Sequence, residues 1–210
     1  NTEGAEHVYQ FVCDWALATD GADTSNTKTN TIVLDICCGT GTIGICVAGV
    51  ASLSHGNLAR VVGIEMVAEA IEDAKVNAEE NKINENMTFL VGKVEDHIDR
   101  VLTLAKEKCE PNTETRIVAI VDPPRSGLRR TIFLFVYFPP LPFSFLSHLI
   151  KPDKKVLHAL RAATNISRLI YVSCNQEALI RDAATLCRPP SNTLKGREFT
   201  PIKVCSFYHV

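Results

Sequence analysis

The chain lacks the surplus of basic residues that a self-sufficient nucleic-acid binder usually carries. Its 210 residues include 22 Lys and Arg against 24 Asp and Glu, which gives a formal net charge of -2. If it binds nucleic acid, most phosphate contacts must come from a local patch or from other parts of a longer protein. The length predicts a single domain, residues 1–210, that is large enough to bury a hydrophobic core.

The chain also lacks any Cys-x-x-Cys pair among its eight cysteines, so the usual zinc and redox motifs are not indicated. Their irregular spacing is unlike that of a small disulfide-stapled secreted domain. Residues 1–20 hold no signal-peptide pattern, and Asn1 in place of a starting Met predicts a segment of a longer protein. We therefore expect free thiols, no metal site and an intracellular location, in the cytoplasm, nucleus or mitochondrion.

Short apolar runs typical of strands alternate with helical patterns along most of the chain. The predicted strands are residues 31–36, 60–65, 87–91, 116–121, 168–173 and 202–207, and the predicted helices are residues 4–18, 43–51, 67–82, 94–106, 153–164 and 176–187. This alternation predicts an α/β fold with a mostly parallel, doubly wound sheet and helices on both faces. Such sheets bind ligands beyond the carboxyl ends of their strands, where we expect the functional residues.

Residues 131–150 do not fit this alternation. They contain five phenylalanines and three prolines but no Asp, Glu, Lys or Arg. A membrane-spanning helix needs about 20 consecutive apolar residues, and each proline inside a helix costs roughly 3 kcal/mol. The prolines therefore favour a buried strand followed by an irregular apolar loop over a membrane span.

A glycine turn follows the first predicted strand, in the sequence Leu-Asp-Ile-Cys-Cys-Gly-Thr-Gly-Thr-Ile-Gly at residues 34–44. Glycines before a helix let the backbone approach a ligand closely. Asp35 would repel a pyrophosphate, so a cofactor with ammonium and sulfonium groups fits better than a dinucleotide; a tight turn without a ligand is the alternative. Glu65 closes the next strand, where an acid binds ribose hydroxyls in nucleotide-binding folds, although alone it would be a surface glutamate.

Two further motifs lie at predicted strand ends. In Val-Asp-Pro-Pro-Arg-Ser-Gly-Leu, two prolines predict a stiff loop in which Asp122 can accept hydrogen bonds and Arg125 can donate them. In Tyr-Val-Ser-Cys-Asn, Cys174 lies between a strand and a helix, where a thiolate nucleophile is well placed. By itself Cys174 is equally consistent with an inert buried thiol, which is our interpretation of the other seven cysteines.

Together these motifs resemble the RNA (uracil-5-)-methyltransferase family, which acts on tRNA and ribosomal RNA. The resemblance covers nearly the whole chain, and residues 186–196 are most similar to the eukaryotic tRNA branch. It implies a Rossmann-like S-adenosylmethionine-dependent methyltransferase fold, with S-adenosylmethionine as cofactor and RNA, above all tRNA, as substrate. It also implies a mechanism in which the thiolate adds to C6 of uracil, C5 takes the methyl group, a base removes the C5 proton, and elimination frees the cysteine.

The resemblance further implies which residues form the site. Cys174 would be the catalytic nucleophile, and the uracil would have to leave its stack to reach it. The cofactor would be bound by Asp35, Cys37, Gly39, Gly41, Thr42, Glu65 and Asp122, and the substrate by Pro123, Arg125 and Asn175. The motifs imply no metal and no membrane, and they give no oligomeric state.

The sequence departs from the family pattern at several positions. Gln176 stands where the family usually has proline. Residues 129–152 intervene where the family runs directly into the next helix, so we interpret them as an atypical insertion such as a retained intron would encode. The tail at residues 205–210 does not match the family's Phe-Pro-x-Thr-x-His-x-Glu ending. We therefore expect the general-base glutamate to be missing and turnover by these 210 residues to be near zero.

Two alternatives belong to other classes. The missing glutamate favours a non-catalytic RNA-binding remnant, whereas the glycine turn and Cys174 disfavour it. The Asp-Pro-Pro sequence also resembles methyltransferases that act on exocyclic amines of nucleic acids. Those enzymes usually place an aromatic residue after the prolines, where this chain has Arg125.

Overall fold

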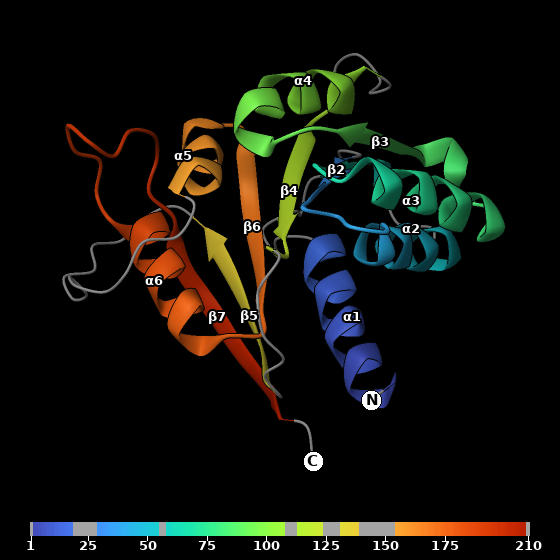
Figure 1. Ribbon diagram of the computed structural model, residues 1–210, viewed down its shortest axis with the longest axis horizontal. Helices are drawn as coiled ribbons and strands as arrows, with labels where there is room; N and C mark the ends of the chain where they lie inside the picture. The colour runs from blue at the N-terminus through green and yellow to red at the C-terminus, as the bar shows by residue number, and fades with distance from the viewer. Residues whose placement is uncertain are drawn as a thin grey trace.

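The computed structural model describes residues 2–18, 29–54, 58–107, 113–123, 131–138 and 154–208. Within these ranges strands and helices alternate as predicted (Figure 1). In chain order they are α1 (Thr2–Leu17), β1 (Asn30–Ile36), α2 (Thr42–Ser54), β2 (Leu58–Glu65), α3 (Ala68–Glu80), a 3-10 turn (Asn84–Asn86), β3 (Met87–Val91), α4 (Val94–Lys106), β4 (Thr115–Val121), β5 (Thr131–Phe138), α5 (Lys154–Ala162), β6 (Ile166–Ser173), α6 (Gln176–Cys187) and β7 (Thr200–Tyr208).

The described strands form one sheet in the order β3-β2-β1-β4-β6-β5-β7. The first five of these strands are parallel to their neighbours, and β5 is antiparallel to both β6 and β7. The strand order reverses between β1 and β4, because β2 and β3 extend to one side and β6 to the other. The predicted α/β fold with a mostly parallel, doubly wound sheet is confirmed.

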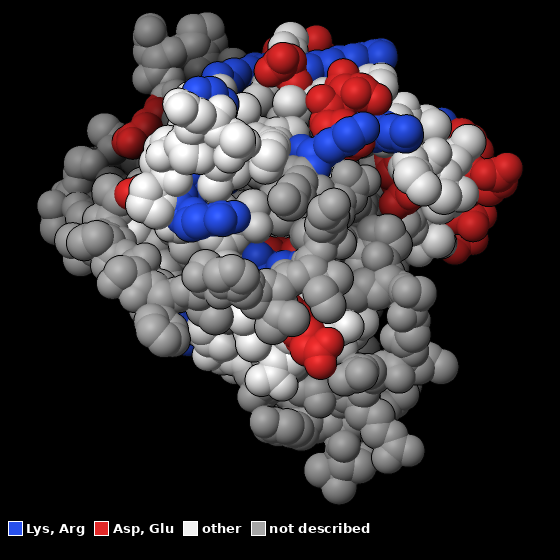
Figure 2. Space-filling model, turned by 60° about the vertical axis from the view of Figure 1, so that its left-hand side comes forward, with Lys and Arg blue, Asp and Glu red and all other residues white. Residues whose placement is uncertain are grey.

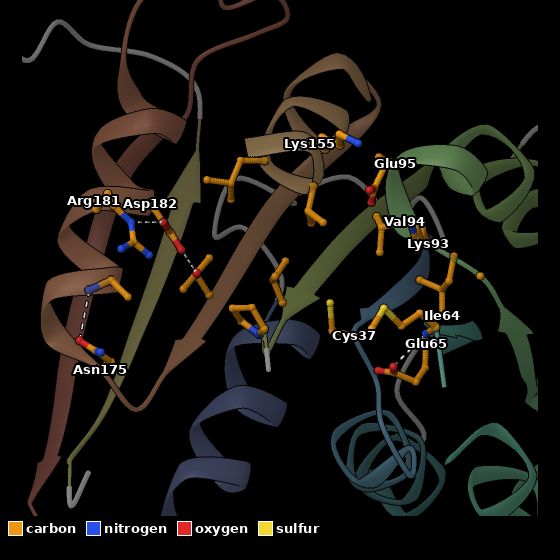
Figure 3. Close-up of a pocket in the computed structure, with 18 residues that line it drawn as sticks. Cys37, Ile64, Glu65, Lys93, Val94, Glu95, Lys155, Asn175, Arg181 and Asp182 are labelled. Carbon is orange, nitrogen blue, oxygen red and sulfur yellow. Dashed lines mark hydrogen bonds and ion pairs between the residues drawn. The ribbon is translucent and has the colours of Figure 1, made fainter. Parts of the chain in front are cut away.

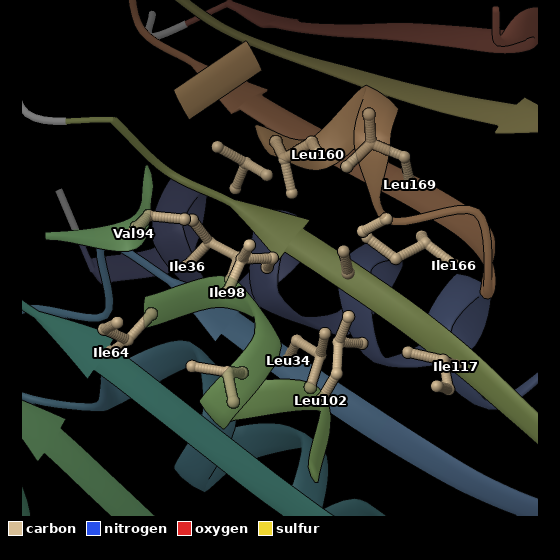
Figure 4. Close-up of a cluster of buried hydrophobic side chains, with 14 of the residues drawn as sticks. Leu34, Ile36, Ile64, Val94, Ile98, Leu102, Ile117, Leu160, Ile166 and Leu169 are labelled. Carbon is tan, nitrogen blue, oxygen red and sulfur yellow. The ribbon is translucent and has the colours of Figure 1, made fainter. Parts of the chain in front are cut away.

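Two hydrophobic clusters hold helices to opposite faces of this sheet. On one face, α4, α5 and α6 cover β1, β2, β4 and β6; Figure 4 shows Val94, Ile98 and Leu102 of α4 against Leu34 and Ile64. On the other face, α1, α2 and α3 cover the alternate side chains of the same strands. Because successive strand residues point to opposite faces, both sides of these strands must be apolar, as their near-continuous hydrophobic runs provide.

The strand predicted within residues 131–150 is confirmed as β5, which pairs along its length with β6 on one side and β7 on the other. The first part of the segment interpreted as an insertion is therefore an internal strand of the sheet. The apolar loop predicted after it lies outside the described residues. Of the helices in the described ranges, none is long and apolar enough to cross a membrane.

A buried arginine ties α5 to α6 and to the loop that leads into β7. Arg161 is fully buried, and its guanidinium donates to the carbonyl oxygens of Leu186 at 2.6 Å, Thr185 at 3.2 Å, Gly196 at 3.3 Å and Lys195 at 3.4 Å. Burial lowers the pKa of this guanidinium from its ordinary value. Because buried carbonyl groups need donors, this single side chain satisfies four of them and fixes the return of the chain to the sheet.

Candidate functional site

The glycine turn after β1 is built from residues with left-handed backbone conformations. Cys37 has a φ of 60°, Gly39 of 52° and Gly41 of 79°. Glycine adopts such angles at little cost, whereas Cys37 is one of the few non-glycine residues here that does so. A Cβ atom on Gly39 would meet no atom within 4 Å, so the turn faces open space. Its backbone can therefore be approached closely by a ligand.

Asp35 lies beneath this turn and anchors the start of α2. It is 1% exposed, and its Oδ2 accepts a hydrogen bond from the backbone N–H of Gly44 at 2.9 Å. A Cβ atom at Gly44 would lie 2.8 Å from that oxygen, which requires glycine at this position. The other oxygen, Oδ1, has no hydrogen-bond partner among the residues that the structure describes. Asp35 therefore supports the turn from below and does not line the cavity described next.

Burial raises the pKa of the Asp35 carboxyl to about 7, and the negative charges of Asp122 and Glu65 add to this, while the Gly44 N–H opposes it. An unfolded aspartate has a pKa near 3.9. Between about pH 4 and pH 7 the unfolded chain therefore loses a proton that the folded chain keeps, and this carboxyl lowers stability as pH rises through that window.

Replacing Asp35 by asparagine should weaken this pH dependence, because the amide cannot ionise. The decline in unfolding free energy between pH 4 and pH 7.5 should shrink by roughly 2–4 kcal/mol, as measured by urea unfolding at each pH. Asp99→Asn, at an exposed position of α4, serves as the control and should leave the decline unchanged. An Asp35→Asn profile parallel to that of the original chain would contradict the assignment.

Glu65 joins the glycine turn to the start of α3. Its Oε2 accepts from the N–H of Gly39 at 3.3 Å, and its Oε1 accepts from the N–H groups of Met66 at 2.8 Å and Val67 at 3.1 Å. A carboxylate has about four lone-pair sites, so these three bonds leave capacity for a ligand hydroxyl. Three backbone donors fix the orientation of the carboxylate before any ligand arrives.

A cavity of about 540 Å³ opens at the carboxyl ends of the parallel strands (Figure 3). It lies where the strand order reverses between β1 and β4, the position at which open α/β sheets bind ligands. Its walls come from the ends of β1, β2, β4 and β6, from the first turns of α4 and α5, and from the first two turns of α6. The lining residues are Cys37, Ile64, Glu65, Met66, Gly92, Lys93, Val94, Glu95, Val121, Pro123, Lys155, Val156, Leu157, Tyr171, Asn175, Ala178, Arg181 and Asp182.

The cavity brings together four of the residues that the sequence predicted for the site, namely Cys37, Glu65, Pro123 and Asn175. The others that are described lie near it without lining it: Asp35, Gly39, Gly41, Thr42, Asp122 and Cys174. Arg125 lies outside the described residues. The predicted cofactor and substrate residues therefore share one edge of the sheet.

Cys174 lies in the turn between β6 and α6. The hydroxyl of Ser173 donates to the carbonyl of Asn175 at 2.9 Å and accepts from its N–H at 3.2 Å. The side-chain oxygen of Asn175 caps α6 by accepting from the N–H of Ala178 at 3.2 Å. Both neighbours of the half-buried Cys174 are thus held by hydrogen bonds, which fixes the backbone of Cys174 between the end of β6 and Asn175, a residue that lines the cavity.

The other thiols nearby are poor nucleophiles. Burial and then the charge of Glu65 raise the pKa of the Cys37 thiol to about 12, and burial and then Asp35 raise the pKa of the Cys38 thiol as well. Both groups stay neutral near pH 7, and the reactive form of cysteine is the thiolate. Cys37 therefore contributes an uncharged wall to the cavity.

Sequence reasoning missed the charged residues that helices bring to the cavity. Lys93 and Glu95 come from the start of α4, Lys155 from α5, and Arg181 and Asp182 from α6. Charged residues on helices usually belong to solvated surfaces, so nothing in the sequence singled these residues out. Within the described ranges, no group of three or more His, Cys, Asp or Glu side chains is arranged to hold a metal ion.

The β1–β2 end of the cavity fits the cofactor that the sequence predicts. Glu65 and Glu95 supply acceptors for the hydroxyl and amino groups of a nucleoside, and Ile64 and Val94 supply apolar surface. These acidic groups suit a cofactor with a cationic sulfonium better than a polyanionic dinucleotide.

Comparisons with known proteins identify a family for this chain. The Methyltransferase domain family matches residues 27–198, which supports S-adenosylmethionine as the cofactor. The tRNA (uracil-5-)-methyltransferase homolog A of Homo sapiens is 36% identical over 203 residues, which are 97% of this chain and 25% of that protein. The Mus musculus homolog A is 37% identical over the same shares. The chain thus spans about a quarter of the length of these curated relatives.

A solved RNA methyltransferase from Salinibacter ruber, in complex with S-adenosyl-L-homocysteine, is 21% identical with a TM-score of 0.33. The overlap covers 55% of this chain and 58% of that one, and an overlap of this size carries no argument about ligands. The match over residues 27–198 is sufficient to assign a family, and over nearly its whole length the chain is also similar to the two mammalian tRNA (uracil-5-)-methyltransferase homologs A. The chain belongs to the methyltransferase domain family.

Proposed function

We propose that this chain is the methyl-transferring part of an S-adenosylmethionine-dependent methyltransferase that acts on C5 of a uridine in RNA. We propose tRNA as the substrate and a reducing intracellular compartment as the location. The observation that carries the proposal is the arrangement of two sites at one sheet edge. Glu65 and Cys37 line one end of the cavity, and Asn175, next to Cys174, lines the other. A cofactor and a base bound at these ends would meet at Pro123.

The chemistry of uracil explains why a cysteine is needed. C5 is a poor nucleophile until C6 carries an electron-releasing adduct. The thiolate of Cys174 forms a bond to C6, and the electrons of the C5–C6 double bond move toward C5 and the O4 carbonyl. S-adenosylmethionine supplies an electrophilic methyl group when bound. A base then takes the C5 proton, the double bond reforms, and the S–C6 bond breaks to regenerate the thiolate.

The residues of the site supply position and water exclusion for these steps. Ser173 and Asn175 hold the backbone on both sides of Cys174, so its thiol does not have to be ordered during the reaction. Glu65, fixed by three backbone N–H groups, orients the hydroxyls of the cofactor's nucleoside. We propose that Asp122 contributes to the cofactor site, that Arg125 hydrogen-bonds the base, and that the rigid Pro123 forms the wall between the two ligands.

The modified atom tests this proposal directly. RNA incubated with the chain and S-adenosylmethionine should acquire its methyl group at C5 of a uridine. Because the general-base glutamate is expected to be missing, this methylated uridine should stay bonded to the Cys174 peptide, where mass spectrometry of the digested complex should find it. A methyl group on an exocyclic amine would instead assign the chain to the methyltransferases that act on exocyclic amines of nucleic acids. Absence of S-adenosylhomocysteine binding in calorimetry would instead favour the non-catalytic RNA-binding remnant.

Replacing Glu65 by glutamine should weaken S-adenosylhomocysteine binding by about tenfold or more. The amide keeps one acceptor oxygen where the carboxylate has two, so it loses the charge-assisted bond to a ribose hydroxyl and part of its own support. Isothermal titration calorimetry measures the change. Glu69→Gln, in the exposed first turn of α3, is the matched control. Equal affinities for the Glu65→Gln variant and the original chain would remove Glu65 from the cofactor site.

A further inference from the structure

An arginine on α6 faces the cavity and has no part in the proposed reaction. The Arg181 side chain is 25% exposed, and its Nε donates to Oδ1 of Asp182 at 3.2 Å. Asp182 is 7% exposed, and its Oδ2 accepts from the hydroxyl of Tyr171. All three residues line the cavity, and Figure 3 shows Arg181 and Asp182 on α6.

The bond to Asp182 orients the guanidinium of Arg181 and leaves its two Nη nitrogens available for a ligand. Both oxygens of Asp182 are engaged, one by Tyr171 and one by the Nε of Arg181. Neither Nη nitrogen of Arg181 forms a hydrogen bond with any residue in the described part of the chain. Two parallel N–H groups on a fixed guanidinium are the geometry that binds a phosphate or carboxylate in a bidentate manner.

Arg181 lies on the same helix face as the residue that follows the proposed nucleophile, Cys174. Asn175, Ala178 and Arg181 follow one another at three-residue spacing on α6, so they share the face that lines the cavity. At 1.5 Å per residue, Arg181 lies about 9 Å along the helix from Asn175, the residue after Cys174. An anion at Arg181 would therefore lie beside a nucleotide whose base is at Cys174.

We propose that Arg181, held by Asp182 and Tyr171, binds a backbone phosphate next to the target uridine. The inference rests on the proposed function, because it takes an RNA uridine at Cys174 as given. The cofactor's carboxylate is the other anion that could bind there. RNA is favoured because Arg181 shares a helix with Asn175, whereas Glu65 and Glu95, which suit a nucleoside with a cationic sulfonium, lie at the other end of the cavity.

The charge distribution agrees with a local phosphate contact. The chain has a net charge of -2, and on the described part of the face in Figure 2 acidic and basic side chains are interspersed. RNA binding cannot then rest on a broad basic field, so individual phosphate contacts matter more. A fixed arginine within a cavity provides one such phosphate contact. This contact would also set the position of the RNA strand along the cavity.

The test combines a protein variant with a neutral phosphate analogue. The probe is a single-stranded RNA pentamer with a central uridine, in which one linkage at a time is replaced by a methylphosphonate. When one linkage flanking the uridine is neutralised in this way, the affinity of the 210-residue chain for the pentamer should fall by about tenfold. In Arg181→Gln the same replacement should change affinity less than twofold. Arg100→Gln, an exposed control on α4, should keep the tenfold effect.

Further measurements separate the possible outcomes. Arg181→Lys keeps the charge without the fork and should show a reduced effect, which gives a second reading if Arg181→Gln fails to fold. S-adenosylhomocysteine affinity should stay within twofold in both variants, and a loss confined to it would assign Arg181 to the cofactor and overturn the proposal. So would a pentamer that does not bind, or equal methylphosphonate effects in Arg181→Gln and the original chain. A phosphate effect that persists without uridine methylation would contradict the proposed reaction but not the phosphate site.

Discussion

Replacing Cys174 by alanine is expected to abolish the covalent complex between this protein and RNA that contains 5-fluorouridine. Fluorine at C5 cannot leave as a cation, so the adduct that forms after methyl transfer cannot break down and accumulates. The complex should survive denaturing electrophoresis and should need S-adenosylmethionine, because methyl transfer follows addition of the thiolate to C6. Mass spectrometry of the cross-linked peptide should locate the bond at Cys174 and find the additional methyl group.

The matched control is Cys46→Ala in α2. Burial raises the pKa of the Cys46 thiol from its ordinary value, so it stays neutral and unreactive near pH 7. This variant should form the complex as well as the original chain does. A complex that persists in Cys174→Ala, or that is lost in Cys46→Ala and not in Cys174→Ala, would end the assignment of Cys174 as the nucleophile.

The second large effect is expected from Gly196→Ala, in the loop between α6 and β7. Gly196 has a φ of 85°, and a Cβ atom there would lie 2.3 Å from the carbonyl oxygen of Arg161 and 2.7 Å from the backbone nitrogen of Ala162. These are backbone atoms of α5, which cannot turn aside as a flexible side chain would. The same displacement would disturb the hydrogen bonds of the buried Arg161 guanidinium.

Unfolding free energy should fall by on the order of 3 kcal/mol or more in Gly196→Ala, which lowers the melting temperature by roughly 6–12 °C for a chain of this length. Gly49→Ala is the control, because Gly49 lies within α2 and a Cβ atom there meets nothing within 4 Å. Alanine favours a helix interior, so that variant should gain up to about 1 kcal/mol. Circular dichroism measures the melting temperatures of both variants. Equal melting temperatures would contradict the predicted clash between a Cβ atom at position 196 and the backbone of α5.

The elements of the fold could be predicted because their signals are local. The predicted helices at residues 94–106 and 176–187 and the strand at 87–91 coincide with α4, α6 and β3. Hydrophobic periodicity and helix starts depend on residues within a few positions of one another, so the sequence carries them directly. The glycine turn and the strand-end positions of Glu65 and Cys174 followed from the same cues.

The roles of individual side chains were less predictable because they depend on partners far away in sequence. Asp35 was expected to contact the cofactor, and the structure shows that it supports α2 through Gly44 from a buried position. Glu65 was expected at the cofactor, but its bond to Gly39, 26 residues earlier, exists only once β1 and β2 are paired. The place of β5 between β6 and β7 likewise follows from pairing and not from its own sequence.

The sequence by itself determined the alternation of elements, the mostly parallel sheet, the methyltransferase family and the sheet edge at which the cavity opens. Only the tertiary structure decided which charged residues meet in the cavity. Lys93, Glu95, Lys155 and Arg181 belong to three different helices, and the sheet's crossovers bring these helices to one edge. The physical reason is that the role of a side chain here is set by its neighbours in space. Burial and hydrogen bonding give Asp182 and Arg181 their orientation only after β6 and α6 have packed.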